Sequence, residues 1–319
     1  MDKPSVILIV GPTGTGKTKY SIQLAKKLDT EIISCDSMQI YRHMDIGTAK
    51  VTKDEMQGIM HHMIDIAEPT RNYSVCDFVY ESKKIIDNML QRGKIPLITG
   101  GTGLYADSLL NGTDFFESAP SDSAYRKELM QLAQKNGAGF IHSMLIKVDE
   151  KSAANIHPNN IKRVIRALEY YHATGETISA HNEKTKENKA PYNSCKIGFT
   201  RNRENLYDRI NKRVDAMLAA GLVDEVKKLV SMGCTCDNTS MQAIGYKEVV
   251  SCLNGEISYE EMTEALKQNS RRYAKRQMTW FKRDAEINWI NLDEAESKSN
   301  VLDMCLEIIN KTLPERSIK

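Results

Sequence analysis

The order of hydrophobic and polar positions predicts alternating strands and helices in the first third of the chain. Residues 5–10 form a short β-branched run that ends at glycine, which is typical of a buried parallel strand. Residues 17–28 place apolar side chains at helical spacing, and a long helix is predicted at about 76–91. Two further strands are predicted at 31–35 and 95–99. This alternation indicates an α/β unit with a parallel sheet.

The pattern changes from about residue 116, where no convincing strand separates the predicted helices, at 125–134, 140–146, 151–156 and 160–174. The polar stretch 181–190 is interpreted as a linker into a short strand at 195–199. Further helices are predicted at 204–219, 222–230, 258–283 and 298–310. We therefore expect an α/β core in 1–115, a helical insertion in 116–190, and completion of the core with C-terminal helices in 191–319.

Composition and charge narrow the class of protein. The 319 residues are 41% hydrophobic and 27% charged, which excludes disordered, collagen-like and coiled-coil chains. The formal net charge is only +2, so any surface that attracts nucleic acid must be local. The longest N-terminal apolar run, residues 6–10, is far shorter than the roughly 20 residues of a bilayer span. We expect a cytoplasmic protein without membrane contact. The seven scattered cysteines argue against a disulfide framework and a zinc finger.

A phosphate-binding loop follows the first predicted strand and opens the first helix. It matches G-x-x-x-x-G-K-[ST] at every defined position: Gly11, Pro12, Thr13, Gly14, Thr15, Gly16, Lys17 and Thr18. The glycines let backbone N–H groups turn inward around a phosphate, Lys17 adds a charge, and Thr18 can ligate Mg²⁺. The loop predicts a P-loop NTPase-like fold and a diphosphate or triphosphate ligand, whatever carries the phosphates.

Two polar residues follow the next strands of the predicted sheet. Asp36 ends the second strand, at the edge where open α/β sheets bind ligands. Such an aspartate commonly caps a turn, but beside a P-loop it can also ligate Mg²⁺ or act as a base on an acceptor. Thr102 lies in a glycine-rich turn after the neighbouring strand and is expected to face the same crevice.

A basic helix is predicted near the C-terminus. Residues 271–283 carry six Lys and Arg residues and no acidic residue. At 100° per residue these cations fall within an arc of about 140°, opposite a stripe of aromatic residues that we expect in the core. The cationic face is predicted to contact a phosphate backbone, with a solvated face as the alternative. Arg209 and Arg213, one turn apart, are equally able to bind phosphate or to pair with acidic residues.

Several sequence blocks are more specific than the P-loop: DSMQIYRHMDIGTAK (36–50), GGTGLY (100–105), HPNNIKRVIRALE (157–169), QAIGYKE (242–248) and AKRQMTWFKR (274–283). Together they resemble the bacterial tRNA dimethylallyltransferase family over essentially the whole chain. The resemblance implies transfer of a dimethylallyl group from dimethylallyl diphosphate to N6 of adenosine 37, beside the anticodon of tRNAs that read UNN codons. The sequence departs from the family pattern at two positions: Asn202 stands where proline is usual, and Lys282 where arginine is usual.

The resemblance also implies roles for individual residues. Asp36 would be the catalytic base, with Lys17, Thr102 and Arg213 as further catalytic residues, and Thr18 would hold Mg²⁺. The diphosphate would lie against residues 11–18 and Arg209. For stabilising the diphosphate as it departs, the family pattern favours Arg213 over Arg209. The tRNA anticodon stem-loop would contact Asp36, Ser37, Met38, Gln39, Thr102, Arg126, Lys162, Arg163, Val164, Ile165, Arg166, Gln242, Ala243, Ile244, Gly245, Tyr246, Lys247, Lys275, Arg276, Gln277, Met278, Thr279, Trp280, Phe281 and Lys282. We expect a monomer.

Other functions also fit parts of the chain. A small-molecule P-loop kinase would explain residues 1–115, with the cations of 162–166 as a closing lid, but would leave the basic helix without a role. An isopentenyltransferase that acts on free nucleotides would share the chemistry and would not need that helix. A nucleotide-gated nucleic-acid-binding protein would bind ATP without transferring a group.

Overall fold

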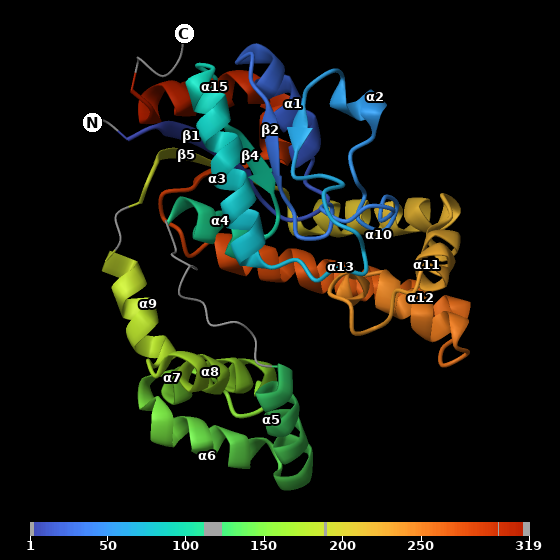
Figure 1. Cartoon of the computed structure of the whole chain (residues 1–319). Helices are drawn as coiled ribbons and strands as arrows, with labels where there is room; N and C mark the ends of the chain where they lie inside the picture. Colours follow the sequence, from blue (N-terminus) through green and yellow to red (C-terminus); the bar gives the residue numbers. More distant parts are fainter. Residues whose placement is uncertain (1–2, 112–122, 188–189, 299, 315–319) are drawn as a thin grey trace. The chain divides into compact units, whose positions relative to one another are not determined.

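The computed structural model describes residues 3–111, 123–187, 190–298 and 300–314. Its central feature is a parallel sheet in the order β3-β2-β4-β1-β5-β6 (Figure 1). The strands are β1 (Ser5–Val10), β2 (Ile32–Cys35), β3 (His61–His62), β4 (Leu97–Gly100), β5 (Asn193–Thr200) and β6 (Asn288–Asn291). All residues of β1 are buried, as expected for a central strand that is covered on both faces.

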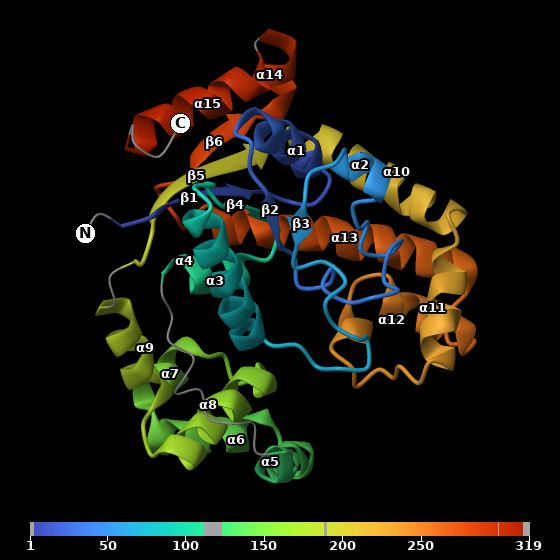
Figure 2. The same ribbon diagram turned by 45° about the horizontal axis from the view of Figure 1, so that its top comes forward.

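Helices cover both faces of this sheet (Figures 1 and 2). On one face lie α1 (Lys17–Lys27) and α15 (Val301–Thr312), whose apolar side chains share one core cluster with β1 and β5. On the other lie α3 (Val75–Gln91) and α4 (Gly103–Leu110), joined by the stacked rings of Phe78 and Tyr105 at 4.4 Å. The prediction of a P-loop-like α/β fold is confirmed.

A layer of helices lies beyond the carboxyl ends of the strands (Figure 1). Its members are α10 (Arg203–Ala219), α11 (Leu222–Ser231), α12 (Tyr246–Leu253) and α13 (Tyr259–Phe281). The long helix α13 packs along α10, where Ala274 meets Leu206 and Ile210. The remaining short elements of this unit are α2 (Lys53–Met56), the 3-10 helix Ser240–Gln242 and α14 (Leu292–Lys298).

Residues 111–190 form a separate compact unit, whereas residues 1–110 and 191–319 form the unit with the sheet. The helices of the smaller unit are α5 (Ser123–Asn136), α6 (Ala138–Val148), α7 (Glu150–Asn155), α8 (Ile161–Thr174) and α9 (Ile178–Glu187). They enclose a hydrophobic core of their own, which includes Leu129, Ile141 and Leu145. The predicted start of the insertion, residue 116, lies outside the described residues.

The linker prediction for residues 181–190 is wrong over most of its length, because α9 continues to Glu187. This helix is polar on most positions and therefore shows no hydrophobic periodicity. Its first turn is held by tertiary contacts instead: the Ser179 amide donates to Asp149 Oδ2 at 3.0 Å. The sequence analysis also missed β3 and β6, which are short edge strands, and α4, α12 and α14.

Candidate active site

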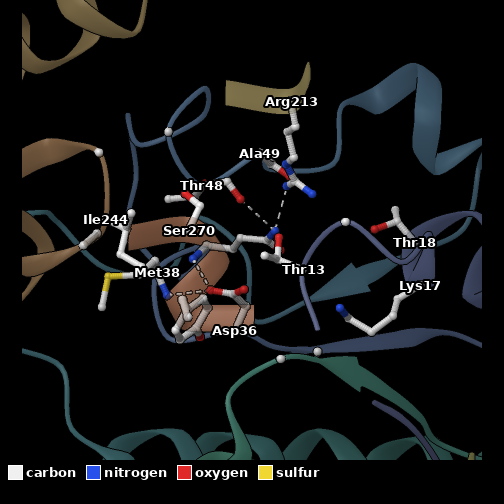
Figure 3. Close-up of a pocket in the computed structure, with 18 of the residues that line it drawn as sticks. Thr13, Lys17, Thr18, Asp36, Met38, Thr48, Ala49, Arg213, Ile244 and Ser270 are labelled. Carbon is white, nitrogen blue, oxygen red and sulfur yellow. Dashed lines mark hydrogen bonds between the residues drawn. The ribbon is translucent and has the colours of Figure 1, made fainter. Parts of the chain in front are cut away.

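A cavity of about 380 Å³ lies in the larger unit, at the carboxyl ends of β1, β2 and β4. Its wall comes from the P-loop, the turn 36–39, the segment 47–49, α10, the segment 242–245 and α13. Figure 3 shows Lys17, Asp36 and Arg213 directed toward this space from three different elements. The structure thus brings together three residues that are far apart in the chain.

The P-loop adopts a conformation that requires glycine. Gly11, Gly14 and Gly16 have φ angles of 145°, 83° and 108°, in the region that side chains disfavour. A Cβ atom on Gly11 would also lie 2.3 Å from the carbonyl oxygen of Phe199 in β5. The loop is therefore fixed against the strand beside it, with its end at the N-terminus of α1, which favours an anion.

Two arginines fasten the loop through its carbonyl groups. Arg209 Nε donates to the carbonyl of Gly14 at 2.8 Å, and Arg201 Nε donates to that of Thr15 at 2.9 Å. Arg201 is buried and also pairs with Asp293 and Glu296 of α14, at 2.6 and 2.7 Å. Arg201 therefore joins the P-loop to the C-terminal part of the chain, a role that sequence reasoning missed.

Lys17 lines the cavity. Its Nζ atom donates to the carbonyl of Pro12 at 2.9 Å. The pKa of the Lys17 amine is lowered to about 7, chiefly by burial and also by the charge of Arg213, whereas the Asp36 carboxylate opposes the shift. The pKa of Arg213 is lowered as well, chiefly by burial. Two cationic groups held close together in a half-buried site create a strong attraction for a polyanion.

Asp36 occupies the turn after β2. Its Oδ1 atom accepts hydrogen bonds from the backbone amides of Met38, at 2.9 Å, and Gln39, at 3.4 Å. These bonds fix the orientation of the carboxylate. Among the residues that the structure describes, no donor is paired with the other oxygen, Oδ2. The Asp36 side chain is therefore both a turn cap and a candidate acceptor of a proton.

Thr102 lies beside the cavity but is not part of its wall. Its Oγ1 atom accepts a hydrogen bond from the amide of Ser37 at 3.0 Å, and its own amide donates to the carbonyl of Cys35 at 3.2 Å. Thr102 thus holds the turn that carries Asp36. Tyr273, predicted to lie in the core stripe of the basic helix, lines the cavity instead, and burial and the Asp36 charge raise its pKa.

Comparisons with known proteins agree with this geometry. The profile of the family described as IPP transferase matches residues 39–284, and that of isopentenyl transferase matches residues 4–70. A tRNA dimethylallyltransferase from Acetivibrio thermocellus is 49% identical over 93% of this chain and 95% of its own length. The chain belongs to the IPP transferase family.

Solved structures of this family resemble the chain over almost its full length. A tRNA isopentenylpyrophosphate transferase from Bacillus halodurans is 45% identical, with a TM-score of 0.71 and coverage of 97% of this chain and 95% of that one. A eukaryotic dimethylallyltransferase acting on tRNA is 30% identical, with a TM-score of 0.82 and coverage of 98% and 82%. The prediction of an enzyme that prenylates tRNA is therefore confirmed, and the kinase and free-nucleotide alternatives are not supported.

The structure separates the two arginines that sequence reasoning left open. Arg213 lines the cavity with Lys17 and Asp36, whereas the guanidinium of Arg209 is occupied by the carbonyl of Gly14 and lies outside that wall. Arg209 instead lines a second pocket with Gly16 of the P-loop, and its contact with the diphosphate stays a prediction.

Several side chains predicted to contact tRNA are instead buried in the protein. Val164 and Ile165 lie in the core of the smaller unit, at 0% and 1% exposure, and Phe281 is buried at 2%. Tyr246 is fully buried and its hydroxyl donates to Glu225 at 2.7 Å. These side chains are not available to tRNA, because successive residues of a helix point in different directions and only part of each predicted block is exposed.

Other predicted tRNA residues occupy suitable positions. Lys162, Arg163, Lys247, Lys275, Arg276 and Lys282 are exposed, and Arg166 is half-buried. Gln242, Ala243, Ile244 and Gly245 line the cavity, together with the predicted Ser37, Met38 and Gln39. Two others are already engaged within the protein: Trp280 donates to Asp107 Oδ2 at 2.7 Å, and Arg126 pairs with the buried carboxylate of Glu169 at 2.6 Å. Met278 is half-buried and Thr279 is exposed.

Glu225 supports the wall of the cavity and was missed by the sequence analysis. Its carboxylate accepts the backbone amides of Asp45, Ile46 and Gly47, at 2.8, 2.7 and 3.0 Å. These bonds fix the segment that continues into residues 47–49 of the wall. No local sequence signal identifies this contact, because Glu225 lies in α11, far along the chain.

Proposed function

We propose that this protein transfers a dimethylallyl group from dimethylallyl diphosphate to N6 of adenosine 37, in tRNAs that read UNN codons. The observation that carries the proposal is the gathering of Lys17, Arg213 and Asp36 around one cavity. The reaction needs cationic groups for a departing diphosphate and a base for the acceptor, and these three side chains supply both.

Asp36 is the proposed base. Adenine N6 is a poor nucleophile because its lone pair is conjugated into the ring, so a proton must leave as the new bond forms. As N6 bonds to the first carbon of the dimethylallyl group, the bond from that carbon to the diphosphate oxygen breaks. The N6 proton passes to the Asp36 carboxylate, and the diphosphate leaves with the electron pair of the broken bond.

The P-loop, Lys17 and Arg213 would hold the diphosphate as its negative charge increases. The Thr18 hydroxyl, at the start of α1, is suited to Mg²⁺, because this ion commonly takes one or two protein oxygens and completes its shell with phosphate oxygens and water. Bound Mg²⁺ would neutralise part of the diphosphate charge. Within the described residues, no three His, Cys, Asp or Glu side chains gather in an arrangement that could hold a metal ion.

The tRNA would bind by its anticodon stem-loop. The target base must leave its stack to enter the cavity, which costs little in a single-stranded loop. The segment 242–245 offers backbone groups to that base, and Ile210, Val214 and Met217 of α10 provide an apolar wall for the prenyl chain. The exposed cations of α13 would hold the phosphate backbone, with those of α8 as a second contact. We propose that the enzyme acts as a monomer.

The described helices include none that is long and apolar enough to cross a membrane. We propose a cytoplasmic site of action, where tRNA is available.

One assay tests the reaction. The protein is incubated with labelled dimethylallyl diphosphate, ATP, AMP and unmodified tRNA, and the products are separated. We expect label in tRNA only, released diphosphate, and no label in a tRNA that carries guanosine at position 37. Label in AMP, or phosphate transfer from ATP, would contradict the proposal.

A further inference from the structure

Gln277 connects α13 to the P-loop. Its side chain is buried, with 5% exposure, on the opposite side of the helix from the exposed Lys275 and Lys282. The Oε1 atom accepts a hydrogen bond from the backbone amide of Thr13 at 2.9 Å. The Nε2 atom donates to the carbonyl of Gly101, after β4, at 2.9 Å. One carboxamide thus joins the P-loop, a central strand end and the basic helix.

The contact is specific for a carboxamide. One backbone group requires an acceptor and the other a donor, and a glutamine side chain offers one of each. A Cβ atom on Gly101 would lie 2.1 Å from Gln277 Nε2, so glycine at position 101 makes the close approach possible. A methionine at 277 would leave two backbone groups without a partner, and an ionised glutamate would place an oxygen against the Gly101 carbonyl.

The bond to Thr13 also determines the position of the catalytic amine. The amide of Thr13 and the carbonyl of Pro12 belong to one planar peptide group. That carbonyl accepts hydrogen bonds from Lys17 Nζ and from Thr15 Oγ1, each at 2.9 Å. The plane that Gln277 holds at its N–H end is therefore the plane that orients Lys17 at its C=O end.

We propose that Gln277 is a positioning residue of the transfer reaction: through the Pro12–Thr13 peptide it orients the Lys17 amine toward the diphosphate of the donor. This inference rests on the proposed function, which places the diphosphate at Lys17. It replaces the earlier prediction that the Gln277 side chain contacts tRNA.

The inference is tested by measuring how tightly the full-length protein binds inorganic diphosphate, using calorimetric titration. Gln277→Met should raise the dissociation constant for diphosphate on the order of tenfold, the usual effect of losing a buried hydrogen-bond partner. Binding of tRNA, measured separately, should stay within about twofold of wild type, since no phosphate contact is removed. Gln268→Met is the matched control, because Gln268 is exposed on the same helix, and it should change neither constant.

Gln277→Glu gives a second readout that a general loss of stability would not produce. A protonated glutamic acid presents one donor and one acceptor, as glutamine does, and burial raises the pKa of such a carboxyl group. The dissociation constant of Gln277→Glu for diphosphate, divided by that of wild type, should therefore fall toward one as the pH is lowered from 8 to 5. The same ratio for Gln277→Met should stay constant. If Gln277→Met does not fold, the pH dependence of Gln277→Glu decides alone.

The outcomes separate the two proposals. If wild type binds no diphosphate, or if Lys17→Ala binds it as tightly as wild type, the proposed function is overturned. If Lys17→Ala weakens binding while Gln277→Met and Gln277→Glu match wild type at every pH, only the positioning role of Gln277 is overturned.

Discussion

The hydroxyl of Tyr246 donates to the Glu225 carboxylate at 2.7 Å, while the ring of Tyr246 packs where a Cβ atom on Gly47 would lie, 2.6 Å from Cε2. The same carboxylate accepts the amides of residues 45–47. Burial and the Glu225 charge raise the pKa of Tyr246, so the hydroxyl keeps its proton and remains a donor. Together, Glu225 and Tyr246 hold one wall of the active-site cavity in place.

Glu225→Ala should therefore lower both stability and activity. Three amides and one hydroxyl lose their acceptor, and we expect the free energy of unfolding to fall by about 1–3 kcal/mol. The catalytic efficiency should fall as the segment 47–49 shifts. Denaturant unfolding and steady-state kinetics measure the two effects. Asp224→Ala is the control, because Asp224 is 81% exposed and pairs only with Lys227 among the described residues. Equal effects of both substitutions would exclude the supporting role of Glu225.

Asp36→Asn should separate the two roles of this side chain. The amide oxygen can still accept from Met38 and Gln39, so the turn should persist, but the base is lost. We expect single-turnover transfer to slow by a factor of roughly 10²–10⁴, with tRNA affinity nearly unchanged. Rapid-quench measurement with enzyme in excess over tRNA gives the rate. A rate close to that of wild type would remove Asp36 from the mechanism.

Diphosphate affinity should depend on pH through Lys17. The pKa of Lys17 is about 7 before ligand binding, and a bound anion favours the charged amine. Above pH 7, binding must therefore take up a proton, and the dissociation constant should rise by up to about tenfold per pH unit from this group. Below pH 7 the amine is already charged and its contribution is constant.

Lys17→Ala isolates this effect. Diphosphate itself also ionises in this pH range, and that contribution is the same for the variant and for wild type. Its profile, measured by titration with inorganic diphosphate, should lack the loss of affinity that begins near pH 7. Two parallel profiles would contradict the role of Lys17.

The lowered pKa of Lys17 also affects stability. Between pH 7 and 10.5 the unfolded chain binds more protons at this residue than the folded chain does, so the free energy of unfolding increases as the pH rises through that range.

The exposed cations of α13, together with Lys282 at its C-terminal end, should determine the salt dependence of tRNA binding. Lys275→Ala or Lys282→Ala should weaken binding to all substrate tRNAs and reduce the slope of log K against log salt by about one for each lost phosphate contact. Selectivity for adenosine 37 should persist. Lys311→Ala, an exposed lysine on α15, is the control and should leave the slope unchanged. A wild-type slope for an Arg272→Ala/Lys275→Ala double variant would restore the solvated-face interpretation.

The parts of the site that sequence reasoning predicted are those that local sequence encodes. The P-loop occupies consecutive residues, and Asp36 directly follows a buried strand, so both could be placed at the sheet edge before the structure was known. Glu225 and Gln277 could not be placed in this way, because their partners lie 180 and 264 residues away. Hydrophobic periodicity also failed for the two-residue strand β3 and the polar helix α9, where tertiary contacts, and not local pattern, determine the structure.

The order of the strands has a consequence for synthesis of the chain. Strand β1 pairs with β4 on one side and with β5 on the other, in register from Ser5 with Asn193 to Val10 with Gly198. The ribosome makes β4 early but must complete residues 111–190 before β5 exists. At roughly 5–20 residues per second, one edge of an apolar strand stays unpaired for several seconds. The nascent protein therefore passes through a stage at which it can aggregate, and chaperones that cover strand edges should raise its yield.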